Sequence, residues 1–244
     1  MNWYEDDELW QNFYHCMFDE ESFDEAQKQI PLLLSLIGHP VQSVLDLACG
    51  PGRHALALLQ KGLQVTAVDS SAFLLNKAKG KVADSSTRFI QADMLDYKAD
   101  KKFDLAINMF NSFGYFDSHE KNQAFIQQTY ENLAETGTFL IDTVGKETLA
   151  RSIEPVHLTE YSNGDIRIER PLLIDNLQIF SNEWLLIRKD KVFRRQYQHY
   201  VYTPMEITQM CLQAGFTNVE VFGSLAGDDY KLDSERLVVV AEKF

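Results

Sequence analysis

Long apolar runs, paired cysteines and an excess of basic residues are all missing from this 244-residue sequence. No stretch reaches the ~18 consecutive apolar residues that cross a bilayer, so we expect no membrane partner. The three cysteines, Cys16, Cys49 and Cys211, form no CxxC pair, which excludes a zinc knuckle and favours reduced thiols in the cytoplasm. Lysine and arginine number 23 against 36 acidic residues, and this net charge of −13 argues against a nucleic-acid partner.

The sequence also lacks a GxxxxGK[ST] segment, which excludes a P-loop NTPase. Its composition is that of a globular protein, with 45% hydrophobic and 24% charged residues and no internal repeat. A chain of this length can form one large α/β domain, with or without a small appendage.

The first 40 residues are expected to be helical. Apolar side chains recur at helical spacing and share one face, at Leu9, Trp10, Phe13, Tyr14, Met17 and Phe18. A second helix is expected to end just before Gly38 and Pro40. We interpret residues 1–40 as a helical N-terminal cap.

From residue 41 onward, apolar strands alternate with short helices. The expected strands are 41–48, 63–68, 88–91, 103–109 and 138–142. The expected helices are 51–60, 71–81 and 120–134, the last of them stopped by Gly137. This alternation predicts a parallel sheet with helices on both faces, and it defines an α/β core over residues 41–149.

Residues 150–203 break this alternation. Apolar and polar residues alternate from Ile166 to Ile174, and residues 183–188 and 192–203 predict two further strands. We therefore interpret residues 150–203 as a small antiparallel β insertion. Residues 204–244 return to the α/β pattern and complete the core, with a helix ending at Gly215 and strands at 218–222 and 236–241.

A tight glycine turn follows the first strand of the core. Within residues 44–55, Gly50, Gly52 and Ala55 also match the dinucleotide fingerprint. Asp46 distinguishes a dinucleotide site from an S-adenosylmethionine site, because a carboxylate beside the turn would repel the pyrophosphate of NAD or FAD. S-adenosylmethionine has no phosphate, and a carboxylate near the turn would attract its ammonium group.

Two further acidic residues follow strands. Asp69 ends the second strand, 17 residues after Gly52, where its two oxygens can accept both ribose hydroxyls. Asp93 follows a short strand 24 residues later and can accept from an adenine amino group, while Met94 can pack on the ring. The order and spacing of Asp46, the glycine turn, Asp69 and Asp93 favour an adenosine-bearing cofactor without phosphate.

These residues resemble the motifs of the class I (Rossmann-like) S-adenosylmethionine-dependent methyltransferases. Residues 45–52 are similar to the first motif of that family, Asp69 to its ribose acid, and residues 92–94 to its adenine-binding segment. Residues 103–115 are similar to the strand-four motif beside the transferred methyl. The resemblance covers nearly the whole chain, and it implies a doubly wound, seven-stranded, mostly parallel sheet whose last strand is inserted antiparallel.

A bacterial subgroup of small-molecule methyltransferases is more similar still. It shares an aromatic N-terminal helix, the segment at residues 111–115, and a β insertion before the final helix. Strand four also lacks the Asn/Asp-Pro-Pro-Tyr tetrapeptide of many methylases that act on nucleobase or glutamine nitrogens.

The resemblance implies a cofactor site and a substrate site, with no metal. S-adenosyl-L-methionine is expected at Tyr14, Asp46, Ala48, Cys49, Gly50, Gly52, Arg53, Asp69, Ser70, Asp93, Met94, Met109 and Phe110. A small molecule with a nitrogen or oxygen nucleophile is expected at Asn111, Ser112, Phe113 and Tyr115.

Methyl transfer is an in-line displacement at a carbon already activated by the sulfonium, so the protein mainly aligns the nucleophile and excludes water. Aromatic walls near the sulfonium are expected from Trp3, Tyr4, Tyr14, Phe110, Phe113 and Tyr115. The candidate proton acceptors are His54, Tyr115, Asp142 and His199, of which we take Tyr115 and His199 as catalytic. We expect the insertion to cover the active site, because it follows the fifth strand at the carboxyl edge of the sheet.

Two other functions stay open. The match of Gly50, Gly52 and Ala55 to the dinucleotide fingerprint allows an NAD(P)-dependent oxidoreductase, against which Asp46 and Asp93 argue. A non-catalytic S-adenosylmethionine-binding protein also fits, because methyl transfer needs few dedicated catalytic groups. The oligomeric state is expected to be a monomer or a homodimer.

Overall fold

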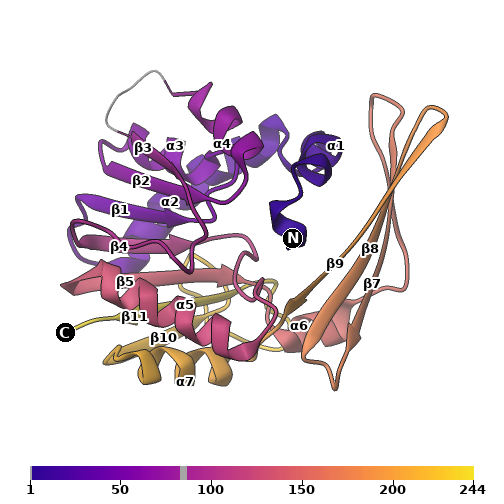
Figure 1. Cartoon of the computed structure of the whole chain (residues 1–244). Helices are drawn as coiled ribbons and strands as arrows, with labels where there is room; N and C mark the ends of the chain where they lie inside the picture. Colours follow the sequence, from indigo (N-terminus) through magenta and orange to yellow (C-terminus); the bar gives the residue numbers. More distant parts are fainter. Residues whose placement is uncertain (1, 83–86) are drawn as a thin grey trace.

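The computed structural model describes residues 2–82 and 87–244, and it forms two sheets within this part of the chain (Figure 1). Met1, the first residue of the predicted N-terminal cap, lies outside the described residues. The larger sheet has the order β10-β11-β5-β4-β1-β2-β3. Its strands are β1 (Ser43–Leu47), β2 (Gln64–Asp69), β3 (Thr87–Gln91), β4 (Phe103–Asn108), β5 (Leu133–Thr143), β10 (Asn218–Phe222) and β11 (Leu237–Glu242).

The larger sheet is mostly parallel and doubly wound, which confirms the expected fold class. Strand β1 pairs in parallel with β2 on one side and with β4 on the other. Strand β11 runs antiparallel between β5 and β10. Because the strand order reverses between β1 and β4, a ligand crevice is expected outside their carboxyl ends.

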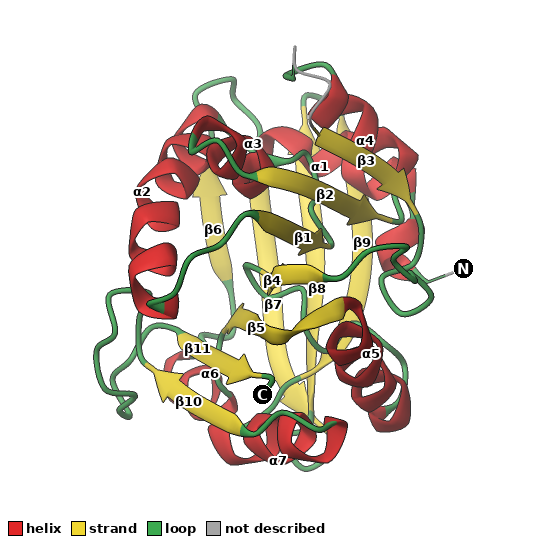
Figure 2. Cartoon of the chain, turned by 90° about the vertical axis from the view of Figure 1, so that its left-hand side faces the viewer, coloured by secondary structure: helices red, strands yellow, loops and turns green. Residues whose placement is uncertain are grey.

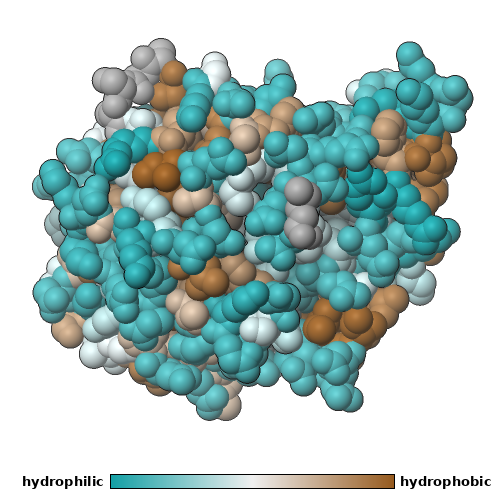
Figure 3. Space-filling model, in the orientation of Figure 1, coloured by the Kyte–Doolittle hydropathy of each residue, from teal (hydrophilic) through white to brown (hydrophobic). Residues whose placement is uncertain are grey.

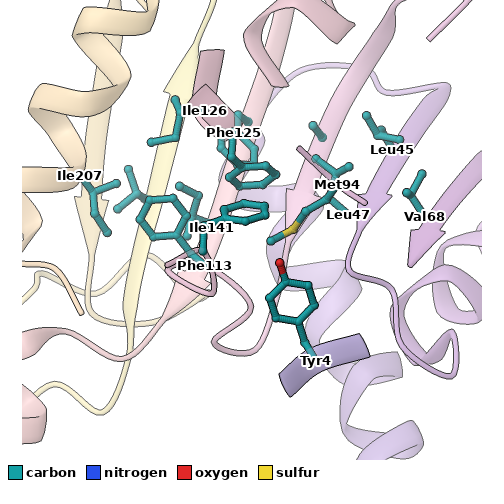
Figure 4. Close-up of a cluster of buried hydrophobic side chains, with 14 of the residues drawn as sticks. Tyr4, Leu45, Leu47, Val68, Met94, Phe113, Phe125, Ile126, Ile141 and Ile207 are labelled. Atoms are coloured by element: carbon teal, nitrogen blue, oxygen red, sulfur yellow. The ribbon is translucent and has the colours of Figure 1, made fainter. Parts of the chain in front are cut away.

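Helices cover both faces of this sheet. They are α1 (Asp7–Met17), α2 (Glu20–Ile37), α3 (Arg53–Gln60), α4 (Ala72–Lys79), α5 (His119–Asn132), α6 (Lys146–Ser152) and α7 (Pro204–Ala214), preceded by a 3-10 turn at Trp3–Glu5. Figure 2 shows α2 and α3 on one side of the sheet and α5 on the other. On the α5 side, Phe125, Ile141 and Ile207 pack with Phe113 in one buried cluster (Figure 4).

The end of α5 and the start of β5 differ from the expectation. The helix was expected over residues 120–134 with Gly137 as its stop, but it ends at Asn132, and β5 begins at Leu133. Gly137 lies inside the strand, where a Cβ would stand 2.9 Å from the carbonyl oxygen of Phe103. A register shift between β4 and β5 at Phe103 brings these backbones close. The glycine therefore permits close approach of two strands and does not end a helix.

The smaller sheet is antiparallel, with the order β6-β7-β8-β9. Its strands are β6 (His157–Glu160), β7 (Ile166–Ile174), β8 (Ile179–Arg188) and β9 (Lys191–Tyr200). Strand β6 and helix α6 were not expected, because both are short and polar. Strand β9 was expected to reach Thr203, but Thr203 caps α7, with its side chain accepting from the amide of Glu206.

Helix α1 lies between the two sheets (Figure 1). Arg195 on β9 pairs with Asp6 at 3.0 Å and with Glu8 at 2.5 Å. Arg188 donates to the carbonyl oxygen of Asn12 at 2.8 Å, and Arg167 donates to that of Cys16 at 3.0 Å. The N-terminal cap thus joins the α/β core to the antiparallel sheet.

The surface agrees with the composition. Figure 3 shows a face on which hydrophilic residues predominate. None of the helices in residues 2–82 and 87–244 is both long and apolar enough to cross a membrane.

Candidate active site

A cavity of about 430 Å³ lies at the carboxyl ends of β1 and β4, where the strand order reverses. The segments that follow β1, β2, β3, β4 and β5 line it, together with the segment from Trp3 to Phe18 and one face of the antiparallel sheet. Its volume is within the range of small-molecule sites.

The glycine turn contains three residues with a left-handed backbone conformation. Ala48, Gly50 and Gly52 all have positive φ angles, of 59°, 56° and 81°. Ala48, Cys49 and Gly50 line the cavity. Gly52 does not; a Cβ there would stand 3.0 Å from the Cβ of Ala78 on α4. Gly52 therefore serves helix packing, while Gly50 presents backbone to the cavity.

Asp69 ends β2 at the wall of the cavity. Its Oδ2 accepts from the amide of Gly50 at 2.7 Å, and its Oδ1 accepts from that of Ser71 at 2.9 Å. Burial raises the pKa of Asp69 to about 6. Each oxygen keeps a further lone pair, so the carboxylate can accept a pair of ribose hydroxyls. Ser70, the next residue, also lines the cavity.

Asp93 and Met94 line the cavity after β3. The Oδ1 of Asp93 accepts from the amide of Leu95 at 2.9 Å, and burial raises the pKa of this carboxyl above its ordinary value. Met94 is buried, and the hydroxyl of Tyr4 points toward it (Figure 4). A carboxylate and a thioether at this place suit the edge and the face of an adenine ring.

The rim beside Asp69 is acidic. A surface depression next to the cavity is lined by Glu5, Asp7, Ser70 and Asp93, among others. The carboxylates there would repel a pyrophosphate or a ribose phosphate. The rim therefore favours a phosphate-free adenosine over NAD(P).

The comparisons with known proteins agree with this geometry. Residues 44–137 match the family model of a methyltransferase domain. The chain is similar to a cypemycin N-terminal methyltransferase from Streptomyces sp, at 26% identity over 83% of each chain. It is also similar to a glycine/sarcosine N-methyltransferase from Aphanothece halophytica, at 24% identity over 84% of this chain and 77% of the relative.

The fold is shared with a solved S-adenosylmethionine-dependent methyltransferase from Clostridium acetobutylicum ATCC 824. The TM-score is 0.79 at 18% identity, over 97% of both chains. Residues 44–137 therefore form a methyltransferase domain, and the chain has the Rossmann-like fold of S-adenosylmethionine-dependent methyltransferases.

In this methyltransferase, Asp46 is buried on β1 and does not line the cavity. Burial, followed by the charge of Asp69, raises the pKa of Asp46 to about 7. Its Oδ2 has no hydrogen-bond partner among the described residues. An acceptor of this kind fits a cationic amino-acid head that reaches the turn directly or through water.

Arg53, at the start of α3, lines the cavity as a largely buried guanidinium. It stacks on Phe110, with 4.0 Å from Cζ to the ring centroid. Burial lowers the pKa of Arg53 to about 10, so the group stays charged at neutral pH. No carboxylate of the described residues lies within ion-pair distance of it. A buried cation without a partner fits the carboxylate of the cofactor.

The loop after β4 is fixed by Asp142. Phe110 and Asn111 have φ angles of 57° and 68°, and their amides donate to the side chain and the carbonyl oxygen of Asp142 at 3.2 Å and 3.0 Å. The other carboxylate oxygen of Asp142 pairs with Arg236 at 2.7 Å. Asp142, a candidate proton acceptor, is thus engaged in shaping the loop. Met109, Phe110, Asn111 and Ser112 all line the cavity.

Tyr115 and His199 lie against each other in the wall of the cavity. Their ring centroids are 5.8 Å apart, and Trp3 packs on Tyr115 at 4.6 Å. Burial raises the pKa of Tyr115 above its ordinary value, so this residue is a neutral phenol. Burial lowers the pKa of His199 to about 4. Its Nδ1 lies 3.0 Å from the carbonyl oxygen of Tyr200, which assigns the proton to Nδ1 and leaves Nε2 as an acceptor.

The remaining candidates take other positions. His54 lines the cavity, but its Nε2 is bound to Gln29 Oε1 at 3.0 Å, and burial keeps its pKa well below the ordinary value. Tyr14 packs on Phe18 and Phe73 outside the cavity. Phe113 is 2% exposed, belongs to the buried cluster of Figure 4 and does not line the cavity.

The sequence reasoning missed the residues that the antiparallel sheet brings to the cavity. They are Arg167, Glu169, Phe180, Asn182, Trp184 and Tyr197. The period-2 alternation along β7, β8 and β9 is a signal that groups them on one face. The sequence alone does not show which face meets the cavity.

Proposed function

We propose that this methyltransferase transfers a methyl group from S-adenosylmethionine to the nitrogen of a small-molecule amine. The amine would bind between the loop at residues 109–115 and the inner face of β7, β8 and β9, which is the face that lines the cavity. The observation that carries the proposal is the pairing of Tyr115 with a neutral His199 at that end of the cavity. The sequence relatives named N-methyltransferases support it.

The cofactor supplies an electrophilic methyl group on a sulfonium centre. We propose that Asp69 holds its ribose, Asp93 and Met94 its adenine, and Arg53 its carboxylate. The turn at Ala48, Cys49 and Gly50 would receive its amino-acid head. Phe110 and Met109 would exclude water from the methyl group.

An amine suits the proton acceptors that this site offers. An alkyl ammonium has a pKa near 10, so a weak acceptor or water can take its proton before transfer, whereas an aliphatic hydroxyl needs a strong base. His199 and the neutral phenol of Tyr115 are weak acceptors. The carboxylate that the insertion brings to the cavity, Glu169, is paired with Arg167 at 2.8 Å. We propose that His199 Nε2 receives the hydrogen bond of the amine while Tyr115 fixes its position.

The net charge and the cysteines support two further parts of the proposal, the kind of substrate and the cellular compartment. The net charge of −13 supports a small molecule and opposes a nucleic acid as the substrate. The three cysteines are unpaired, which supports a reducing compartment such as the cytoplasm.

The test is a matched pair of probes, cyclohexylamine and cyclohexanol, incubated with the protein and S-adenosylmethionine. We expect S-adenosylhomocysteine and N-methylcyclohexylamine from the amine and no product from the alcohol. Calorimetry with S-adenosylmethionine, and with NADPH as the control, establishes that the protein used is competent. Methylation of cyclohexanol, or cofactor binding without turnover of any amine, would contradict the proposal.

A further inference from the structure

The inner face of the antiparallel sheet carries polar groups that the cofactor residues do not use. Phe180, Asn182 and Trp184 occupy alternate positions on β8, and all three line the cavity. Arg167 and Glu169 line the same cavity from β7. This wall is therefore where the substrate would be recognised.

Three of these side chains hold a buried polar atom that has no partner among the described residues: Trp184, Asn182 and, at its Nε, Arg167. Trp184 is 8% exposed, and its Nε1–H has no acceptor among the described residues. Asn182 is 2% exposed, and within the same part of the chain its Oδ1 has no donor. Buried polar groups are nearly always paired in folded proteins. An unpaired donor near an unpaired acceptor, both on one cavity wall, points to a ligand that supplies the missing partners.

The opposite charges of Arg167 and Glu169 neutralise each other on this face of the sheet. Arg167 gives Nη2 to Glu169 at 2.8 Å and Nη1 to the carbonyl oxygen of Cys16 at 3.0 Å. The amide nitrogen of Asn182 also donates to Glu169, at 3.2 Å. Both terminal nitrogens of the guanidinium are therefore occupied, while its Nε has no acceptor among the described residues. A substrate carboxylate would meet the oxygens of Glu169 and Asn182. The wall suits a neutral group that both donates and accepts.

We propose that Asn182 and Trp184 determine substrate specificity by binding a hydroxyl group of the amine that is methylated. The Cα atoms of residues two positions apart on a strand are about 6.7 Å apart, and the tips of the Asn and Trp side chains can approach to the roughly 5 Å that one hydroxyl with two hydrogen bonds spans. The hydroxyl accepts from Trp184 Nε1 and donates to Asn182 Oδ1. This inference rests on the proposed amine methylation, and it predicts a hydroxylated amine without a carboxylate.

Three probes that differ in one substituent test the inference: trans-2-aminocyclohexanol, 2-aminocyclohexanecarboxylate and cyclohexylamine. We expect kcat/KM for the aminocyclohexanol to exceed that for each of the other two by about tenfold. The chain holds three tryptophans, so the indole N–H of Trp184 is resolved and assigned by NMR with the Trp184→Phe variant. In the complex with S-adenosylhomocysteine, the aminocyclohexanol is expected to shift this resonance.

The variants separate specificity from folding. Trp184→Phe keeps an aromatic ring against Phe13 and Tyr197 and removes the N–H. We expect it to abolish the preference for the hydroxyl, so that within this variant kcat/KM for the aminocyclohexanol falls to that for cyclohexylamine. Asn182→Leu is expected to do the same. Ser181→Ala is the matched control, since Ser181 lies on the opposite face of β8 and accepts from Gln196 and Gln198.

Preference for the carboxylate probe, a hydroxyl preference that survives Trp184→Phe, or an unmoved Trp184 resonance overturns the inference. Failure of the proposed function has a different signature. In that case no amine is methylated, whether or not the aminocyclohexanol moves the Trp184 resonance.

Discussion

The amide of Tyr200 donates a hydrogen bond to the carbonyl oxygen of Gly114 at 2.8 Å. This bond joins the end of β9 to the loop after β4. It places His199 and Tyr115, the neighbours of the bonded residues, against each other. The contact therefore connects the substrate wall to the α/β core at the point where chemistry is proposed.

Gly114→Ala is expected to disrupt this contact. A Cβ at Gly114 would overlap the carbonyl oxygen of Tyr200, and the φ angle of 98° strains any other residue. We expect kcat/KM to fall by about 100-fold, since the two rings separate, with affinity for S-adenosylmethionine retained. The control is Gly164→Ala, where φ is 83° and nothing lies within 4 Å of the added Cβ. Equal losses in both variants would refute a special role of the contact.

Asp69→Ala is expected to weaken the binding of S-adenosylmethionine by about 100-fold, because hydrogen bonds to a charged acceptor are lost at both ribose hydroxyls. The amides of Gly50 and Ser71 would also lose their acceptor. Calorimetry gives the dissociation constant. Asp190→Ala, an exposed acid at the turn between β8 and β9, serves as the control.

Affinity for S-adenosylmethionine is expected to increase as pH rises from 5 to 8. The pKa values of Asp69 and Asp46 are raised to about 6 and about 7, so both acids hold protons at low pH in the free protein. A cationic cofactor favours their ionised forms, and its binding at pH 6 therefore releases protons. Calorimetry in two buffers of different ionisation enthalpy gives the number of protons released on binding. The Asp46→Asn variant is expected to release fewer protons. An affinity that is constant over this range would contradict the assignment.

The same raised pKa values have a consequence for stability without cofactor. Between pH 4 and 7 the unfolded chain has already released these two protons, while the folded chain still holds them. Their contribution to the free energy of unfolding is thus largest at low pH and declines as pH rises toward 7. Denaturant titration of the Asp46→Asn variant is expected to show a weaker decline than the natural chain.

His199→Phe is expected to lower kcat/KM by about 10- to 100-fold while cofactor binding is unchanged. The phenyl ring keeps the packing against Phe180 at 5.2 Å, and only the acceptor is lost. Because the pKa of His199 is about 4, the natural chain is expected to show no inflection from this residue above pH 6. The kcat/KM of the natural chain should rise with pH until the substrate amine is deprotonated. An unchanged kcat/KM in His199→Phe would remove this residue from the mechanism.

Arg195→Met is expected to loosen the N-terminal cap. Arg195 on β9 holds Asp6 and Glu8, next to the aromatic residues Trp3 and Tyr4 of the cavity wall. We expect dissociation of S-adenosylmethionine to accelerate about threefold, while the free energy of unfolding falls by less than about 1 kcal/mol, because the pairs are partly exposed. Stopped-flow fluorescence measures the rate. Raising the salt concentration should accelerate dissociation in the natural chain and not in the variant.

The sequence by itself determined the features that depend on neighbouring residues. The alternation of apolar runs and capped helices predicted the α/β core. The spacing of Gly50, Asp69 and Asp93 predicted a cofactor edge whose residues do line one cavity. These signals are local, since each acid directly follows the strand that carries it.

Tertiary structure decided what depends on distant segments. The sequence pattern assigned Gly137 to a helix end and Phe113 to the substrate, but the close approach of β4 and the packing of Phe125 gave both residues other surroundings. Asn182, Trp184 and Arg167 have no motif, and only the docking of the antiparallel sheet against α1 turns them toward the cavity. The alternation along a strand assigns residues to two faces. Which of these faces meets the cavity depends on contacts between segments that lie far apart in the chain.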